Sequence, residues 1–429
     1  MKKIAFYTLG CKLNYAETSH IAQKFKQKGY TVVDDNEIAD IYIINSCTVT
    51  KDAEKDCRQR VRHYLRKNPN AFIGVIGCYA QIRPDEIAAI DGVHIIVGND
   101  AKYDLHNLIN TTQKYGFPSI INKPTEELNS FGVAYSGDND ERTRAFLKVQ
   151  DGCDYNCSYC TIPLARGKSR SLAPEEVISY INKILDNGYL EIVLTGVNVG
   201  DYAYNNYSFY DLLKEIDNIK RDFRIRISSI EPNLLTDDII KLVSNSEHFA
   251  NHFHIPLQSG NDKILAKMQR RYNTKMFSNV IDKIISNVHN YGLGIDVIVG
   301  FPDETDDDFL VTYNFLENIP FTYLHVFTYS ERPSTKALQI ENKVEKSIKK
   351  ERNFKLKRLS DFKKEIFYNN SINSIHRVIF EHTNYDGIMK GYTDNYIRVF
   401  TNFDENFVNK FVKVKILQNT NNMCKVEII

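Results

Sequence analysis

The sequence predicts an α/β protein of three parts: a doubly wound parallel-sheet domain, a central partial (β/α) barrel and a small, OB-like β-barrel. Short apolar, β-branched runs alternate with helical patterns over residues 1–114, and the same alternation returns over 144–370. Such repeated βα units are typical of parallel sheets. Closely spaced short strands over 371–429 indicate the third part. Residues 115–143, rich in Asn, Ser, Asp, Gly and Pro, are expected to form a linker across the surface.

The length and net charge of the chain limit which kinds of protein it can be. The chain has 429 residues and a formal net charge of +1. This length supports two or three domains with buried cores, and near-neutrality means that any RNA binding must use local basic patches. No apolar run approaches the ~20 residues that span a bilayer, so we expect no membrane association. The eight cysteines, with no export signal, indicate a cytoplasmic, reducing location and metal ligation rather than disulfides.

In the first part, four apolar runs are predicted strands and the segments between them are predicted helices. The strands are Ile4–Thr8, Ile41–Asn45, Phe72–Ile76 and His94–Val97, and the helices are Glu17–Lys28, Asp52–Lys67, Pro84–Ile90 and Lys102–Asn110. Because parallel sheets bind ligands beyond the carboxyl ends of their strands, that edge is the expected site.

Three cysteines share this edge. Cys11, Cys47 and Cys78 each follow one of the first three strands and stand beside Gly or Ser. Three thiolates can hold a 4Fe–4S cube and leave one iron open. The competing interpretation is three unrelated core cysteines. Cys57, inside a predicted helix, and Cys424, at the start of the last strand, lack this placement and are interpreted as structural.

A second group of cysteines has the spacing C-x3-C-x2-C. Cys153, Cys157 and Cys160 follow the predicted strand Phe146–Val149. Three thiolates again leave one iron of a cube open, which is what a catalytic metal site requires. A zinc loop and disulfides are the alternatives, but structural zinc normally takes four ligands and no further cysteine stands nearby. The motif therefore predicts a site where a small molecule binds iron and is reduced.

The remaining elements follow the same reasoning. Six βα units favour a partial barrel, whose strands are Phe146–Val149, Glu191–Leu194, Arg224–Ser228, His252–Leu257, Ile295–Val299 and Leu324–Phe327. Helices include Pro174–Asn187, Lys275–Tyr291 and the long stretch Glu345–Tyr368. The terminal strands are Arg377–Glu381, Ile388–Tyr392, Tyr396–Phe400, Phe411–Leu417 and Cys424–Ile429. A barrel of this size is a common RNA-binding shape, although a packing cap is the alternative.

The motif Cys153–Cys160, with Tyr159 before its third cysteine, resembles the radical S-adenosylmethionine superfamily. Other segments resemble the methylthiotransferases within it, and the last part is similar to their TRAM domain. These segments are Thr8–Asn14, Asn45–Thr50, Gly77–Gln81, Thr195–Gly200, Ser228–Pro232, Pro256–Gly260 and Gly300–Glu304. The resemblance covers nearly the whole chain and is greatest to the tRNA N6-threonylcarbamoyladenosine methylthiotransferases.

The resemblance implies two 4Fe–4S clusters and S-adenosylmethionine as cofactors. One cluster is held by Cys11, Cys47 and Cys78, and the other by Cys153, Cys157 and Cys160. One S-adenosylmethionine would methylate a sulfur at the first cluster. Another would give a 5′-deoxyadenosyl radical that takes hydrogen from carbon 2 of the modified adenosine. The implied partners are the tRNA anticodon stem-loop, a low-potential electron donor of flavodoxin or ferredoxin type, and a sulfur donor.

The same resemblance points to cofactor contacts. Tyr159, Gly196 and Glu231 match positions at which the superfamily surrounds S-adenosylmethionine. Gln258 is a further candidate, because it stands on a predicted strand-end loop that can face the same site. For Gly196 the alternative is an ordinary glycine of a βα turn.

Basic residues are candidate contacts for phosphate or carboxylate. Arg166, Lys168 and Arg170 follow the cysteine loop directly. The stretch Asp52–Lys67 has six basic and three acidic residues, and Glu341–Asn370 has ten and five. Such helices would supply salt-sensitive affinity for tRNA. Solvated surface charge is the alternative for each.

Several functional alternatives stay open. The acceptor could instead be N6-isopentenyladenosine in tRNA or an aspartate of a ribosomal protein. A non-catalytic iron–sulfur protein that binds RNA and a structural zinc protein belong to other classes. Since a threonylcarbamoyl group carries a carboxylate, its pocket is expected to offer a cation or several donors.

Overall fold

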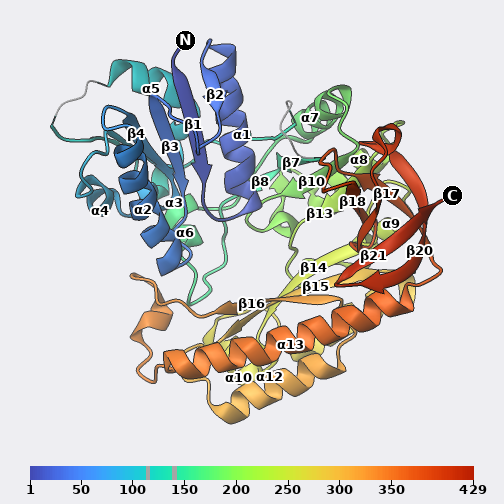
Figure 1. The fold of residues 1–429 in the computed structure, drawn as a ribbon. Coiled ribbons are helices and arrows are strands. Elements are labelled where there is room, and N and C mark those ends of the chain that lie inside the picture. The colour runs from blue at the N-terminus through green and yellow to red at the C-terminus, as the bar shows by residue number, and fades with distance from the viewer. Residues whose placement is uncertain (113–115, 138–142) are drawn as a thin grey trace.

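The computed structural model describes residues 1–112, 116–137 and 143–429, which fold into three consecutive units (Figure 1). The centre of the expected linker, Asp138–Asp140, and its first residue, Tyr115, lie outside the described residues. None of the described helices combines the length and apolar character needed to cross a bilayer.

The first unit is a six-stranded parallel sheet with the order β2-β1-β3-β4-β5-β6. Its strands are β1 (Lys3–Thr8), β2 (Thr31–Val33), β3 (Ile41–Ser46), β4 (Phe72–Gly77), β5 (Ile95–Val97) and β6 (Ser119–Ile121). The chain passes outward from β1 to β2 and then back across β1 to β3. Winding therefore reverses between β1 and β3, and ligands bind at such a reversal in sheets of this kind.

Helices cover both faces of this sheet, as the doubly wound prediction requires. The helices are α1 (Lys12–Gln27), α2 (Lys51–Lys67), α3 (Cys78–Ile82), α4 (Pro84–Ala88) and α5 (Leu105–Thr111), with a 3-10 turn at Ala101–Asp104. Ile21 and Phe25 of α1 pack in one core with Leu105 and Ile109 of α5. Residues of α2 and α4 pack in a second core on the other face, where Cys57 is fully buried, consistent with a structural role.

Two three-residue strands of the sheet, β2 and β6, were not predicted. β6 lies inside the segment expected to be a linker, where Ser119–Ile121 pairs in parallel with β5. Further along, Ser136 N donates to Phe146 O at 2.9 Å and Lys148 N donates to Ala134 O at 2.9 Å. The described part of this segment thus supplies one edge strand and covers another edge, so it is not a simple surface linker.

The second unit is an arc of parallel strands in two three-stranded sheets, β13-β10-β7 and β14-β15-β16. The strands are β7 (Arg144–Lys148), β10 (Glu191–Thr195), β13 (Arg224–Ile227), β14 (His252–Gln258), β15 (Gly292–Val299) and β16 (Tyr323–Thr328). Ile230 N donates to His254 O at 3.0 Å, which links the two sheets. Among the described strands no ladder joins β7 to β16, so the predicted partial barrel is open there.

Helices surround the outside of the arc. They are α6 (Ile162–Arg166), α7 (Pro174–Asp186), α8 (Phe209–Asp217), α9 (Asp237–Asn245), α10 (Asp262–Lys267), α11 (Thr274–Asn287), α12 (Asp306–Asn318) and α13 (Lys346–Asn370). Short strands β8 (Gln150–Asp151) and β9 (Arg170–Ser171) pair beside the cysteine loop, and β11 (Ala203–Tyr204) pairs with β12 (Tyr207–Ser208). The long helix α13 runs along the base of the molecule to the last unit (Figure 1).

The third unit is a closed barrel with the strand order β17-β18-β19-β21-β20. Its strands are β17 (Ile375–Phe380), β18 (Ile388–Thr393), β19 (Arg398–Asn402), β20 (Phe411–Thr420) and β21 (Met423–Ile428). Cys424 is fully buried in its core, as expected of a structural cysteine. The turn between β18 and β19 packs against the start of β15, where Asn395 O would lie 2.0 Å from a Cβ at Gly292.

Candidate functional site

The three cysteines of the first unit come together at the reversal of its winding. Cys11 follows β1, Cys47 follows β3 and Cys78 begins α3 directly after β4. The three thiols lie within electrostatic range of one another. Gly10 adopts φ +96°, and a Cβ at this position would lie 2.8 Å from Cys47 Sγ. Glycine therefore lets the end of β1 approach Cys47 closely.

A buried ion-pair network lies behind this cysteine group. Arg166 donates to Glu17 Oε1 and to Asp151 Oδ1, each at 2.9 Å. Lys102 donates to Glu17 Oε2 at 2.6 Å, and Lys148 donates to Asp151 Oδ2 at 3.0 Å. These three cations outnumber the two carboxylates, so the network carries excess positive charge.

Arg166 is the cation through which this network acts on the cysteine thiols. It is 1% exposed and lies within electrostatic range of Cys11 and Cys78. A nearby cation favours the thiolate form that binds metal. Arg166 is therefore neither an external phosphate ligand nor solvated surface charge, since it binds carboxylates of the chain itself. Arg170 likewise donates to Ser130 O at 3.1 Å and to Arg166 O at 2.8 Å, whereas Lys168 is exposed.

The second group of cysteines lies in the loop between β8 and α6. Cys160 lies within electrostatic range of both Cys153 and Cys157. Backbone N–H groups of Tyr155 and Ile162 donate to Cys153 Sγ and Cys160 Sγ, each at 3.4 Å. Burial raises the pKa of both thiols to about 12. A bound metal ion would remove these protons outright, and backbone donors to sulfur are typical of iron–sulfur sites.

Arg270 organises the surroundings of this loop, although it belongs to no motif recognised in the sequence. Its Nη1 donates to Cys157 Sγ at 3.0 Å and to the Tyr159 hydroxyl at 3.4 Å. Its Nη2 forms an ion pair with Glu231. Two of the predicted cofactor residues, Tyr159 and Glu231, thus meet at one guanidinium beside a cysteine.

Unpartnered polar atoms mark the ends of the neighbouring strands. Among the described residues, both amide atoms of Asn198, the Ser228 hydroxyl and Gln258 Oε1 are buried without a hydrogen-bond partner. Gln258 also adopts φ +66° at a register shift of β14. Buried polar atoms left unpaired are costly, so this cluster fits a polar ligand such as S-adenosylmethionine. The segments containing Asn198 and Ser228 were recognised in the sequence, but these two side chains were not singled out.

Gly196 has a packing reason to be glycine. A Cβ at this position would lie 2.8 Å from Gln150 Oε1 and 3.0 Å from Gln150 O. The same Oε1 accepts hydrogen bonds from Val197 N at 3.0 Å and Asn198 N at 2.9 Å. Close packing on Gln150 accounts for the glycine, and a cofactor contact at Gly196 stays a prediction.

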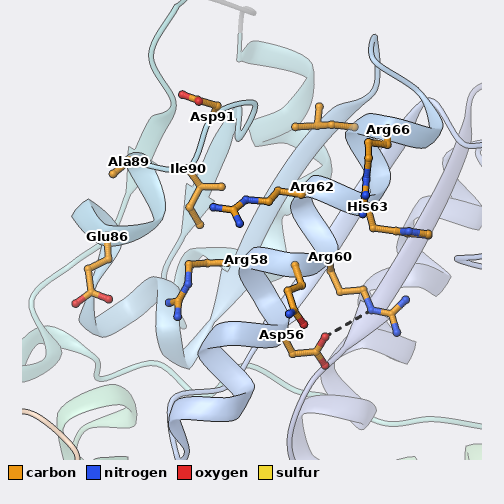
Figure 2. A pocket seen from close by; sticks show the side chains of 12 residues that line it. Asp56, Arg58, Arg60, Arg62, His63, Arg66, Glu86, Ala89, Ile90 and Asp91 are labelled. Carbon is orange, nitrogen blue, oxygen red and sulfur yellow. Dashed lines mark ion pairs between the residues drawn. The ribbon is translucent and has the colours of Figure 1, made fainter.

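The basic face of α2 lines a groove of about 1000 Å³ (Figure 2). Arg58, Arg62, His63 and Arg66 lie along it, and Glu86 and Asp91 lie on the opposite side. Arg62 and Arg66 are exposed, and Arg60 is paired with Asp56 at 3.7 Å. This surface fits the predicted phosphate contacts.

The basic stretch of α13 is used differently from the prediction. Lys349 and Arg352 are buried, and Arg352 contacts Glu304 Oε1 at 2.7 Å. Part of the positive charge of α13 therefore holds the helix to the arc.

Comparison with known proteins identifies the family of the chain. The family model described as Radical SAM superfamily matches residues 147–316, and the one described as Uncharacterized protein family UPF0004 matches residues 3–98. The threonylcarbamoyladenosine tRNA methylthiotransferase MtaB of Bacillus subtilis (strain 168) is 41% identical over 97% of this chain and 94% of its own length. The chain belongs to the radical SAM methylthiotransferases. Members of the radical SAM superfamily use S-adenosylmethionine and a 4Fe–4S cluster.

Other members and structures fit the same family. A tRNA-2-methylthio-N(6)-dimethylallyladenosine synthase of Fusobacterium nucleatum is 32% identical over 86% of each chain. Among solved structures, the radical S-adenosylmethionine methyltransferase TsrM of Kitasatospora setae superposes with a TM-score of 0.58, at 11% identity, over 76% of this chain and 73% of that one. At this identity the similarity shows the radical SAM fold alone.

Proposed function

We propose that this methylthiotransferase adds a methylthio group to carbon 2 of N6-threonylcarbamoyladenosine, next to the anticodon of tRNA. One observation carries the proposal: two separate three-cysteine sites occur in a chain that is 41% identical to a relative named for this substrate. A reaction that needs both a radical source and a sulfur-bearing centre accounts for both sites.

The chain's own residues fit these cofactors. Cys153, Cys157 and Cys160 would hold one 4Fe–4S cluster with three thiolates. Cys11, Cys47 and Cys78 would hold the other. When bound, S-adenosylmethionine and its cluster supply a radical that takes hydrogen from an unactivated carbon.

Other side chains position these groups. Arg270 fixes Cys157 and is itself held by Glu231. Asn198, Ser228 and Gln258 offer buried polar atoms toward S-adenosylmethionine, and Tyr159 packs beside Phe301 with ring centroids 6.5 Å apart. Burial of these groups keeps water away from the reacting carbon.

The tRNA would contact more than one unit. We assign the last barrel to the TRAM type, which suits RNA binding, and the α2 groove to phosphates of the anticodon stem-loop.

We expect the enzyme to work in the cytoplasm, with a low-potential flavodoxin or ferredoxin as electron donor and with a separate sulfur donor. The domain divisions 1–114, 115–143, 144–370 and 371–429 are retained as proposals, with β6 transferred to the first unit.

Mass spectrometry of tRNA nucleosides tests this function. Cells lacking the gene should lose 2-methylthio-threonylcarbamoyladenosine and accumulate threonylcarbamoyladenosine. Complementation with Cys57→Ser should restore the product, whereas Cys47→Ala and Cys157→Ala should not, because each removes one ligand of a different cluster. Loss of the isopentenyladenosine product instead would reassign the acceptor. Normal product in the Cys157→Ala strain would remove the cluster assignment.

A further inference from the structure

Residues of all three units surround Lys12, which directly follows the cluster cysteine Cys11. Lys12 is exposed, yet it lies within electrostatic range of Arg144 at the start of β7, Asp296 of β15 and Tyr396 of the barrel turn. An exposed lysine of the first unit therefore lies near residues of both the arc and the terminal barrel, and we refer to its surroundings as the Lys12 space.

This space extends toward the second cysteine group. Asp296 lies within electrostatic range of Glu231. Glu231 pairs with Arg270, which donates to Cys157 Sγ at 3.0 Å. The side chains from Lys12 to Arg270 thus trace a route from one cysteine group to the other, which is where an acceptor base must lie under the proposed function.

Positive charge exceeds negative charge at the Lys12 end of this route. Three guanidiniums share the single carboxylate of Glu191: Arg224 and Arg226 contact it at 3.1 Å, and Arg144 reaches it only at 4.0 Å. Arg224 and Arg226 direct their other donors to backbone oxygens of the barrel, at distances of 2.6 to 3.3 Å. Arg144 keeps 27% of its side chain exposed.

Lys12 and Arg144 are the cations that keep free donors. In the part of the chain that the structure describes, no ion pair involves Lys12. The carboxylate on that side of the space is Asp296, and its Oδ1 already bonds His254 at 2.7 Å and His325 at 3.2 Å. An anion entering the space would therefore find cations whose donors are unused.

Tyr396, in the turn between β18 and β19, lies close to Lys12 and Arg144. Its ring stacks on Tyr392 at 4.6 Å and on His252 at 4.5 Å, and the Arg144 guanidinium lies 5.8 Å from its ring centroid. It adopts φ +71°, a conformation that costs energy for a residue with a side chain and that is typical of functional sites. The barrel thus holds an aromatic ring in a fixed place beside the two cations.

We propose that Lys12 and Arg144 bind the carboxylate of the acceptor's threonyl group and so select this nucleoside. The inference rests on the proposed function and adds the residues that recognise the acceptor. Two charge-assisted hydrogen-bond donors suit a carboxylate. An apolar isopentenyl group in the same place would leave both cations desolvated and unpaired, which disfavours that acceptor.

The test compares two synthetic anticodon stem-loops that differ only at this carboxylate. One carries threonylcarbamoyladenosine and the other carries its neutral methyl ester. For Lys12→Met and for Arg144→Met, the KM for the acid should rise roughly 10- to 100-fold, the value of one hydrogen bond to a charged group. The KM for the ester should change little, so the preference of the wild type for the acid should disappear. Lys12→Arg should restore part of the preference.

Binding provides a readout that needs no turnover. Fluorescence anisotropy should give the same loss of preference between the acid and ester stem-loops. Lys26→Met, at the far end of α1, is the matched control and should retain the wild-type preference. Equal losses for acid and ester, or no loss for either, would overturn the proposal. If Lys12→Met binds less iron, the Arg144→Met result decides, because Arg144, unlike Lys12, does not adjoin a cluster cysteine in sequence.

The outcome also separates this proposal from the proposed function. A wild-type enzyme that modifies neither stem-loop, but does modify one with isopentenyladenosine, would reject the function itself. A wild type that modifies acid and ester equally well would retain the function and reject the carboxylate site.

Discussion

At the scale of single residues, side chains that contact sulfur are the ones that tune the proposed chemistry. Arg270 contacts a cysteine sulfur, a tyrosine hydroxyl and a carboxylate at the same time. Burial raises the pKa of Glu231, and Arg270 opposes this rise. Hydrogen bonds to sulfur and nearby charge are among the determinants of the reduction potential of an iron–sulfur cluster.

Arg270→Lys should make the cluster at Cys153, Cys157 and Cys160 harder to reduce. A lysine cannot reproduce the fork that reaches both Cys157 and Glu231, so the extra negative charge of the reduced cluster loses a donor. The potential should fall on the order of 60 mV, which corresponds to about 1.4 kcal/mol for one electron. A redox titration followed by electron paramagnetic resonance measures this shift.

The matched control is the neighbouring residue. Arg271 donates to Asp154 O at 2.9 Å and lies 3.9 Å over the Tyr155 ring, with no contact to sulfur. Arg271→Lys should leave the potential unchanged. Equal potentials for wild type and Arg270→Lys would contradict the role of Arg270.

The contrast between Cys157 and Arg270 explains what sequence could predict at this scale. Cluster cysteines can be recognised in a sequence by their spacing, or because they follow strands whose ends share one edge of a sheet. Arg270 stands 113 residues after Cys157, and Arg166 stands 149 residues after Glu17. Such pairings depend on how loops fold back, and nothing in one chain encodes them in a readable pattern. Arg166 does bind carboxylates, one of the two predicted kinds of ligand, but they belong to Glu17 and Asp151 of the chain itself.

At the scale of elements, helix α2 packs one of its faces into the core and presents a basic face to the groove. Cys57, Val61 and Tyr64 pack inward. Arg58, Arg62 and Arg66 recur every four residues and so lie on one stripe. Like charges at this spacing destabilise a helix by about 0.2–0.5 kcal/mol per pair, so the stripe is better explained by an anionic partner than by stability.

Replacing Arg62 and Arg66 together by alanine should weaken tRNA binding. Each lost phosphate contact should reduce the slope of log affinity against log salt by about one, so the double variant should lose about two. Filter binding between low and moderate salt measures the slope. Lys214→Ala with Lys220→Ala, two exposed lysines of the arc, is the control and should keep the wild-type slope. An unchanged slope in the arginine variant would exclude the groove as a phosphate site.

The six-residue strands of the first sheet were predicted, whereas of its three-residue strands only β5 was. The buried runs that became β1, β3 and β4 are six residues each, whereas β2 and β6 have three. Three residues carry too little periodicity to stand out, and β6 is held by its ladder to β5 rather than by its own composition.

At the scale of the whole molecule, buried ion pairs join the first unit, which carries one cysteine group, to the arc, which carries the other. Glu17 belongs to α1 of the first unit, while Arg166, Lys148 and Asp151 belong to the arc. A second link joins Arg332 to Glu54 of α2. Because these pairs are buried, the units are joined by contacts that tolerate little movement.

Glu17→Gln should therefore destabilise the protein at neutral pH. The change leaves Lys102 without a carboxylate partner and leaves Arg166 with Asp151 alone. Breaking a buried ion pair in this way typically costs about 3–5 kcal/mol. Guanidinium unfolding at pH 7, without oxygen, measures this free energy. Glu37→Gln is the control, since Glu37 and Lys3 form an exposed pair at 3.7 Å and such pairs contribute about 0–1 kcal/mol.

The pH dependence of the wild type supplies the last test of this network. Burial alone would raise the pKa of Glu17, but Arg166, Lys102 and Lys148 hold it well below its usual value. A carboxyl group whose pKa is depressed by folding stabilises the folded state above its unfolded pKa of about 4.3, and this stability is lost as pH falls toward the folded pKa. The wild type should thus lose stability steeply below about pH 4, and Glu17→Gln should lose less over the same interval. Parallel acid limbs for the two proteins would mean that Glu17 is not charged in the folded state.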